Sequence, residues 1–171
     1  MIDETDYDAP DHCTVGVIGE VGNRLFLFYC RQGLTETTVK VEKQQVAVLA
    51  SYLGRIVKEL GRPGHLPDDL SFDGTEDPEW VVGTIGVSYD EELDRVVVVL
   101  EEVHDEDEDE DDDESGHVLR IALTREQAAA FAIHATRLVE SGRPPCPLCG
   151  LPLDPSGHDC PRTNGHRPPV T

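Results

Sequence analysis

Two stretches of the chain show the same order of hydrophobic patterns: two apolar runs, an alternating segment and then an amphipathic helix. Runs rich in β-branched and aromatic residues suit strands, and alternation of apolar and polar positions indicates a strand with one buried face. The strands expected in the first stretch are 15–19, 24–28 and 37–41. Those expected in the second are 82–86, 95–99 and 117–123. Each stretch therefore predicts three strands followed by one helix.

Both helices are expected from apolar residues that recur three and four positions apart. The first opens near Glu42 and stops at Gly61, and the second is preceded by Thr124 and stops at Gly142. Glycine past a helix end is a common stop signal. Thr124 and Gln127 form a T-x-x-Q capping box. The expected apolar face of the first helix is Val46, Leu49, Ala50, Leu53, Ile56, Val57 and Leu60. The expected face of the second is Ala128, Phe131, Ala132, Ala135, Leu138 and Val139.

The two stretches also resemble each other position by position. Aligned helices share Gln45/Gln127, Ala47/Ala129, Ala50/Ala132, Arg55/Arg137 and Val57/Val139. We predict an α+β fold: a tandem βββα repeat of two pseudo-symmetric units, with antiparallel sheet and the helices on one side. The duplicated body, 13–141, divides into units 13–62 and 80–141 joined by a linker, 63–79. Each unit is near the lower size limit for a self-sufficient core, so we expect the two to fold together. The pattern leaves open whether the six strands form one sheet or two.

The chain is strongly acidic, with a formal net charge of −21. Residues 105–114 are all Asp or Glu, so we expect the surrounding loop, 104–116, to be solvated and disordered. Negative charge repels phosphate groups, and neither nucleic acid nor membrane is an expected partner. Protein partners with a basic surface are expected instead. In a further reading, the acidic loop mimics nucleic acid and occupies a basic protein.

The cysteines carry the most specific chemistry. No apolar run approaches the roughly 20 residues of a membrane span, and the acidic N-terminal segment does not resemble a signal peptide. We therefore expect a cytoplasmic protein, in which disulfides are rare and clustered cysteines indicate metal or redox chemistry. Cys13 and Cys30 flank the first expected hairpin, and we interpret them as buried free thiols that face each other.

The remaining cysteines, in the segment 142–171, predict a zinc-knuckle or ribbon-like tail. Cys146 and Cys149 lie in a C-P-x-C-G turn, and His158 and Cys160 supply a second pair that completes a tetrahedral Cys₃His site for structural Zn²⁺. His166 is the competing fourth ligand. A redox dithiol and a catalytic zinc are the alternatives, but Pro and Gly in the turn and four nearby soft ligands favour a closed structural site.

Three parts of the sequence resemble a known family. Residues 39–50, residues 82–86 and the tail motif C-P-L-C-G…H-D-C-P resemble an uncharacterised, mainly actinobacterial family, domain-of-unknown-function family 3090. The resemblance covers nearly the whole chain. It implies Cys146, Cys149, His158 and Cys160 as the metal-binding positions, and it carries no established activity.

The residues outside the tail form no recognisable catalytic constellation. Our leading hypothesis is a non-catalytic, zinc-stabilised binding or adaptor protein. The alternative is a small-molecule-binding protein or enzyme with a site between the two units, to which Arg24, Arg95 or Glu42 would converge. Glycines recur in the first strand of each unit, and we interpret them as bulges or close-packing points rather than phosphate loops. These glycines are Gly16, Gly19, Gly83 and Gly86.

Overall fold

The structure is a computed structural model, and it describes residues 2–20, 23–104, 116–141 and 147–149. These residues form an α+β fold, mostly strands, with two helices and two sheets. In chain order the elements are β1 (Ile2–Tyr7), β2 (His12–Ile18), β3 (Leu25–Gln32), β4 (Thr35–Val41), α1 (Lys43–Leu60), β5 (Val82–Asp90), β6 (Arg95–Glu102), β7 (Gly116–Leu123) and α2 (Arg125–Glu140).

The six expected strands and both helices are found at the expected places in the chain. Strand β1 was not expected, and it pairs parallel with β7, so the sheet is not purely antiparallel. The strands divide into a three-stranded sheet of order β2-β3-β4 and a four-stranded sheet of order β1-β7-β6-β5. That the two halves are copies of one unit stays a prediction.

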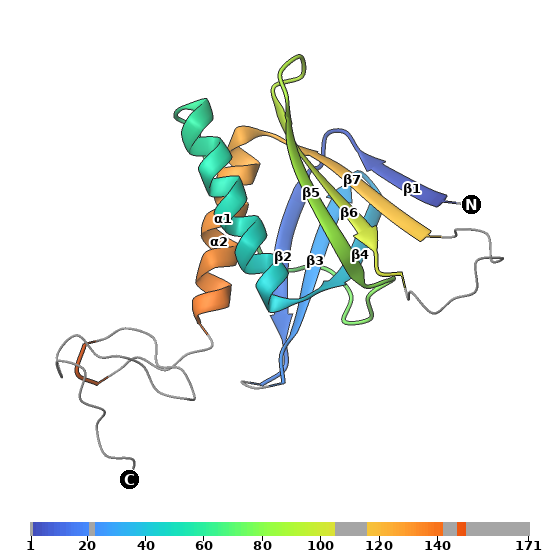
Figure 1. Cartoon of the computed structure of the whole chain (residues 1–171), viewed down its shortest axis with the longest axis vertical. Helices are drawn as coiled ribbons and strands as arrows, with labels where there is room; N and C mark the ends of the chain where they lie inside the picture. The colour runs from blue at the N-terminus through green and yellow to red at the C-terminus, as the bar shows by residue number, and fades with distance from the viewer. Residues whose placement is uncertain (1, 21–22, 105–115, 142–146, 150–171) are drawn as a thin grey trace, which may run out of the picture.

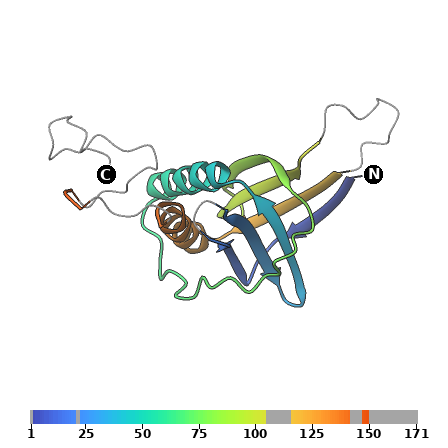
Figure 2. The same ribbon diagram turned by 90° about the horizontal axis from the view of Figure 1, so that it is seen from below.

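The two sheets meet where the linker enters β5. The Lys40 amide of β4 donates to the Trp80 carbonyl at 2.9 Å, and the Glu79 amide donates to the Thr38 carbonyl at 2.9 Å. A single parallel bridge, Lys40 to Val81, follows. Helices α1 and α2 lie side by side next to both sheets (Figures 1 and 2). Beyond the bridge, α1 runs beside β5, the outer strand of the four-stranded sheet.

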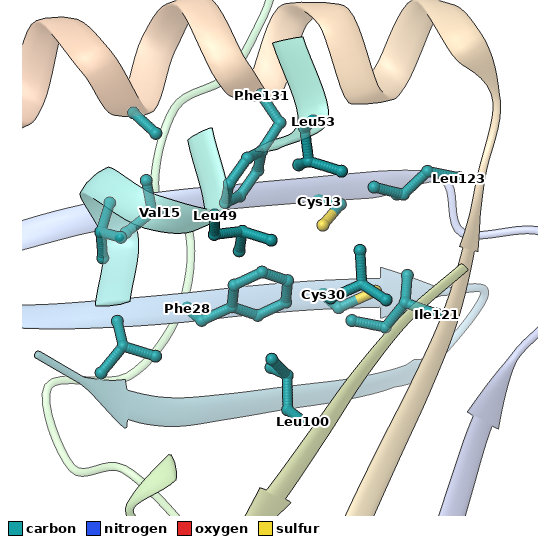
Figure 3. Packing of buried hydrophobic residues seen from close by; sticks show 14 of the residues in the cluster. Cys13, Val15, Phe28, Cys30, Leu49, Leu53, Leu100, Ile121, Leu123 and Phe131 are labelled. Atoms are coloured by element: carbon teal, nitrogen blue, oxygen red, sulfur yellow. The ribbon is translucent and has the colours of Figure 1, made fainter. Parts of the chain in front are cut away.

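One hydrophobic core receives side chains from both sheets and both helices (Figure 3). The Phe28 ring of β3 packs against the Phe131 ring of α2, with centroids 5.4 Å apart. Leu53 of α1 and Ile121 of β7 are fully buried in the same cluster. The predicted apolar faces of the helices are confirmed, because their residues are buried in this cluster or packed against it. Within the described residues the two halves of the chain therefore share this core.

Cys13 and Cys30 occupy directly opposite positions on β2 and β3, and both are buried free thiols, as predicted (Figure 3). Burial raises the pKa of the Cys13 thiol well above its ordinary value, and the neighbouring Cys30 adds to the shift. The Cys13 thiol therefore stays protonated at neutral pH, and both buried cysteines act as small apolar side chains.

The linker, 63–79, contains no helix or strand, but it is tied to the outer face of the three-stranded sheet (Figure 2). The Thr14 hydroxyl donates to the Leu70 carbonyl at 2.7 Å. A Cβ at Gly16 would come within 2.5 Å of the Phe72 ring, so this glycine is a close-packing point, as predicted. Burial, with the Glu36 carboxylate beside it, raises the pKa of Tyr29 on this face to about 12.

The capping box of α2 gives a direct test of helix stability. The Gln127 amide donates to Thr124 Oγ1 at 3.1 Å, and Gln127 Oε1 accepts the Thr124 amide at 3.0 Å. Thr124→Ala leaves the Gln127 amide without this partner, and we expect it to lower the free energy of unfolding by about 1 kcal/mol in urea denaturation. Thr136→Ala on the exposed side of the same helix is the matched control and is expected to cost nothing. Equal losses in both variants would contradict the capping role.

Candidate functional site

A groove of about 380 Å³ opens at the surface between α1 and β5. It lies where the helix runs beside the outer strand of the second sheet (Figure 1). Helix α1 contributes Gln45, Val48, Leu49 and Tyr52 to its lining, and β5 contributes Ile85 and Val87. The groove therefore lies between an element of the first expected unit and an element of the second.

The helix side of the groove is a second apolar stripe on α1. Residues three, four and seven positions apart share one face of a helix, which places Gln45, Val48 and Tyr52 together. The Val48 side chain is 61% exposed and that of Tyr52 is 44% exposed, while Leu49 between them is buried. The solvent side of an amphipathic helix normally carries polar groups. Here α1 presents apolar side chains to the core on one side and to the groove on another.

The strand side of the groove is the inner face of β5. Ile85 and Val87 are partly buried and pack against the core, while Thr84, Gly86 and Ser88 between and beside them are exposed. Successive side chains of a strand point to opposite faces, which explains this alternation. Strand β5 pairs with β6 alone, so it is an edge strand of the described sheet.

Gln45 fixes the near end of the groove. Its Nε2 donates to the carbonyls of Val82 and Gly83, each at 3.2 Å, and its Oε1 accepts the Glu42 amide at 2.8 Å. The pairing of β5 with β6 shifts register between Val82 and Thr84, and a Cβ at Gly83 would lie 2.7 Å from the Val103 Cα. The predicted role of Gly83 as a bulge or close-packing point is confirmed. The first turn of α1 is thereby joined to the start of β5.

A hydrogen-bonded cluster fixes the far end. The Tyr89 hydroxyl donates to Asp94 Oδ1 at 2.6 Å, and Arg125 Nε donates to the same oxygen at 2.8 Å. The Tyr89 hydrogen bond and then the Arg125 guanidinium lower the pKa of Asp94, and Asp94 in turn raises the pKa of Tyr89. Arg125 Nη1 also donates to the Leu60 carbonyl at the end of α1, at 2.7 Å. Hydrogen bonds therefore connect α1 with β5 at the first turn of the helix and at its last residue. These contacts set the spacing between α1 and β5 without a ligand.

Acidic side chains lie at both ends of β5. Glu91 and Glu92 are exposed in the turn that follows the strand. At the other end, Glu101 and Glu102 of the neighbouring strand β6 pair with Thr84 and Val82 of β5. The His117 ring lies 2.8 Å from the Glu102 carboxylate, and this hydrogen bond lowers the pKa of Glu102. The Glu102 carboxylate is therefore ionised at neutral pH, and acidic residues lie on β6 at one end of β5 and in the turn at the other.

The predicted zinc ligands fall almost entirely outside the described residues. Cys149 lies half-buried in a short turn, 147–149, whereas Cys146, His158, Cys160 and the competing His166 lie outside the described residues. Within the described residues no group of three or more Cys, His, Asp or Glu is placed to hold a metal ion. The zinc site stays a prediction.

Other expected site residues lie elsewhere. The groove lining does not include Arg24, Arg95 or Glu42, although the groove does lie between the two halves as the alternative hypothesis requires. Sequence reasoning missed Val48 and Tyr52. The signal that would have found them is an apolar residue and an aromatic residue four positions apart, outside the predicted core face of α1.

Comparison with protein families gives a match over most of the chain. A family model described as "Protein of unknown function (DUF3090)" matches residues 5–160. The chain belongs to this DUF3090 family. The matched region includes α1, β5 and all four predicted zinc ligands, so the groove and the tail up to Cys160 lie within the DUF3090 match. Comparison with curated proteins and with solved structures gives no significant match. Neither α1 nor α2 combines the length and the hydrophobicity needed to cross a lipid bilayer.

Proposed function

We propose that this DUF3090 protein is a non-catalytic, cytoplasmic binding or adaptor protein that holds a segment of a partner protein in the groove between α1 and β5. The observation that carries the proposal is the exposed apolar stripe of α1, with Val48 61% and Tyr52 44% exposed, facing the edge strand β5. Apolar side chains gathered in an open groove commonly mark interaction sites.

The composition of the lining favours binding over catalysis. Five of its six side chains are apolar or aromatic, and the sixth is the amide of Gln45. General acid–base catalysis needs a group that exchanges protons near neutral pH, and nucleophilic catalysis needs an activated hydroxyl, thiol or amine. The lining offers shape and apolar surface, which suit the recognition of side chains.

We also propose that the tail binds one structural Zn²⁺ through Cys146, Cys149, His158 and Cys160. Three thiols and an imidazole match the donor preference of zinc. The ion would cross-link a segment that has few apolar residues of its own. Two further proposals remain from the sequence: the halves are copies of one βββα unit, and protein partners carry a basic surface.

Val48→Glu tests the groove. The substitution places a carboxylate at the centre of the apolar stripe, and because Val48 is mostly exposed the fold is expected to tolerate it. We expect proteins captured from native lysate by the full-length chain to be lost at least tenfold with the variant, measured by quantitative mass spectrometry. A buried unpaired charge in an interface costs several kcal/mol, which is more than tenfold in affinity.

Ile133→Glu is the matched control, because Ile133 is a β-branched residue of α2 that is 45% exposed and is not part of the groove lining. Its captured proteins are expected to equal those of the unmodified chain. Equal capture by the Val48→Glu variant would contradict the proposal. The size of the groove also suits a small ligand, for which pockets of about 300–1,000 Å³ are typical. Native mass spectrometry that shows a small molecule bound to the unmodified chain, and absent from the Val48→Glu variant, would favour that second function.

A further inference from the structure

We infer that the occupant of the groove is an extended, basic segment of a partner protein, which adds to the open edge of β5 as a further strand of the β1-β7-β6-β5 sheet. The inference rests on the proposed function, because it names the partner class and binding mode of the same groove. Three independent features support it: the state of the β5 edge, the alternation of side chains beside it and the negative charge of the turn that follows the strand.

The edge of β5 is long and little protected. Proteins usually guard edge strands with proline, lysine, a bulge or a covering element. The nine residues of β5, Val-Gly-Thr-Ile-Gly-Val-Ser-Tyr-Asp, include no proline and no lysine. The bulge at Gly83 and the bridge at Val81 protect only its start, and from Thr84 to Asp90 the pairing with β6 is regular. The outward backbone groups of this stretch therefore form a template for another strand.

Helix α1 stands beside this edge but does not close it. Gln45 joins the first turn of α1 to the start of β5. At the other end of the helix, the Leu60 carbonyl accepts a hydrogen bond from Arg125, which also binds Asp94 in the turn after β5. Between these points the groove of about 380 Å³ remains open. An added strand would take its main-chain hydrogen bonds from β5 and place every second side chain against Val48, Tyr52 and Val87. The intervening side chains would face solvent, so the partner segment alternates apolar and polar residues.

Charge selects the partner. Glu91 and Glu92 are exposed in the turn that follows β5, whereas Glu101 and Glu102 lie on β6, on the side of β5 away from its open edge. Lysine or arginine at the end of the added strand beside this turn would meet the carboxylates of Glu91 and Glu92. A second copy of this chain would bring its own net charge of −21 to the same edge, and like charges disfavour that pairing. The occupant is therefore a basic partner rather than another DUF3090 chain.

A fluorescent peptide as long as β5 tests the inference on the full-length protein. The probe is Lys-Lys-Val-Thr-Val-Thr-Val-Lys-Lys, and its counterpart replaces each lysine with glutamate. We expect saturable binding of the basic probe by fluorescence anisotropy and at least tenfold weaker binding of the acidic one. No binding of the basic probe at millimolar concentration would overturn the inference, since main-chain hydrogen bonds do not depend on the side-chain sequence.

Backbone N-methylation separates strand addition from other modes. Only one edge of an added strand faces β5, so methylating alternate amides on that edge removes several main-chain hydrogen bonds at once. One methylated set is expected to lose at least tenfold in affinity, and the other set is expected to bind within about twofold. Equal affinities for the two sets, high or low, would overturn strand addition and indicate a helical or irregular occupant.

Variants and hydrogen exchange distinguish failure of the strand-addition inference from failure of the proposed binding function. Val48→Glu is expected to weaken the basic probe at least tenfold, and Ile133→Glu is expected to leave it unchanged. Amides of Thr84–Asp90 are expected to gain protection from hydrogen exchange when the probe binds. If Val48→Glu still abolishes capture of partners while the two methylated sets bind equally, only the binding mode is wrong. If light scattering shows a dimer that Val48→Glu dissociates, a second copy occupies the edge and the basic-partner assignment is overturned.

Discussion

Phe131→Ala is expected to lower the free energy of unfolding by about 3–5 kcal/mol, the range for loss of a buried aromatic ring. The Phe131 side chain is 1% exposed and packs against Phe28, at the point where α2, α1 and the three-stranded sheet meet (Figure 3). Small domains are stable by only about 5–15 kcal/mol, so a large part of the total is removed. Urea denaturation followed by far-ultraviolet circular dichroism measures the loss as a lower midpoint.

Ile133→Ala is the control for that measurement. Ile133 follows closely on the same helix but is 45% exposed, and its truncation is expected to change stability by less than about 1 kcal/mol. Because both sheets and both helices share one core, the Phe131→Ala variant is expected to unfold in a single transition. Two separate transitions, or equal losses in the two variants, would contradict the shared core.

Zinc binding by the tail is expected to be lost completely when Cys146 and Cys149 are both replaced with serine. The purified chain is expected to contain one zinc ion per molecule, measured by elemental analysis, and the double variant is expected to contain none. Structural zinc sites in small modules bind with apparent free energies of about 10–16 kcal/mol, and removal of two thiolates leaves an incomplete tetrahedron.

The other thiols and histidines of the chain supply the controls for zinc. Cys13→Ala and Cys30→Ala are expected to leave the zinc content unchanged, because both thiols are buried in the core of the body. His158→Ala is expected to weaken zinc retention during dialysis against a chelator, and His166→Ala is not. One zinc ion per molecule in the Cys146→Ser, Cys149→Ser double variant would show that these thiols do not hold the metal.

Both helices and six of the strands could be predicted from the sequence because their signals are local. The spacing of apolar residues predicted the buried face of α1, and Thr124 with Gln127 predicted the cap of α2. Strand β1 was missed because half of its residues are acidic and most are exposed, with only Tyr7 buried. It exists because Tyr7 enters the core and its backbone pairs with β7, which is distant in sequence. Pairing with a strand so distant in the sequence leaves no periodic pattern in β1 itself.

The groove was only partly predictable for a related reason. A site between the two halves was one of the hypotheses, but its residues depend on how β5 separates from β4 beyond the bridge at Val81. That separation is a tertiary property, and the apolar character of Val48 and Tyr52 alone did not indicate it. The zinc ligands were proposed from spacing within a short segment. Most of them lie outside the described residues, and the metal content of the purified chain tests them directly.

The parallel pairing of β1 with β7 also limits how the protein can be assembled as it is synthesised. Strand β1 leaves the ribosome before its partner, because Ile2 pairs with Gly116, which is made only after the acidic run. The nascent chain therefore carries an unpaired strand until β7 has been made. Asp3, Glu4 and Asp6 keep that strand hydrated and discourage pairing with neighbouring nascent chains. The second sheet is completed only when β7 has emerged to lie between β1 and β6.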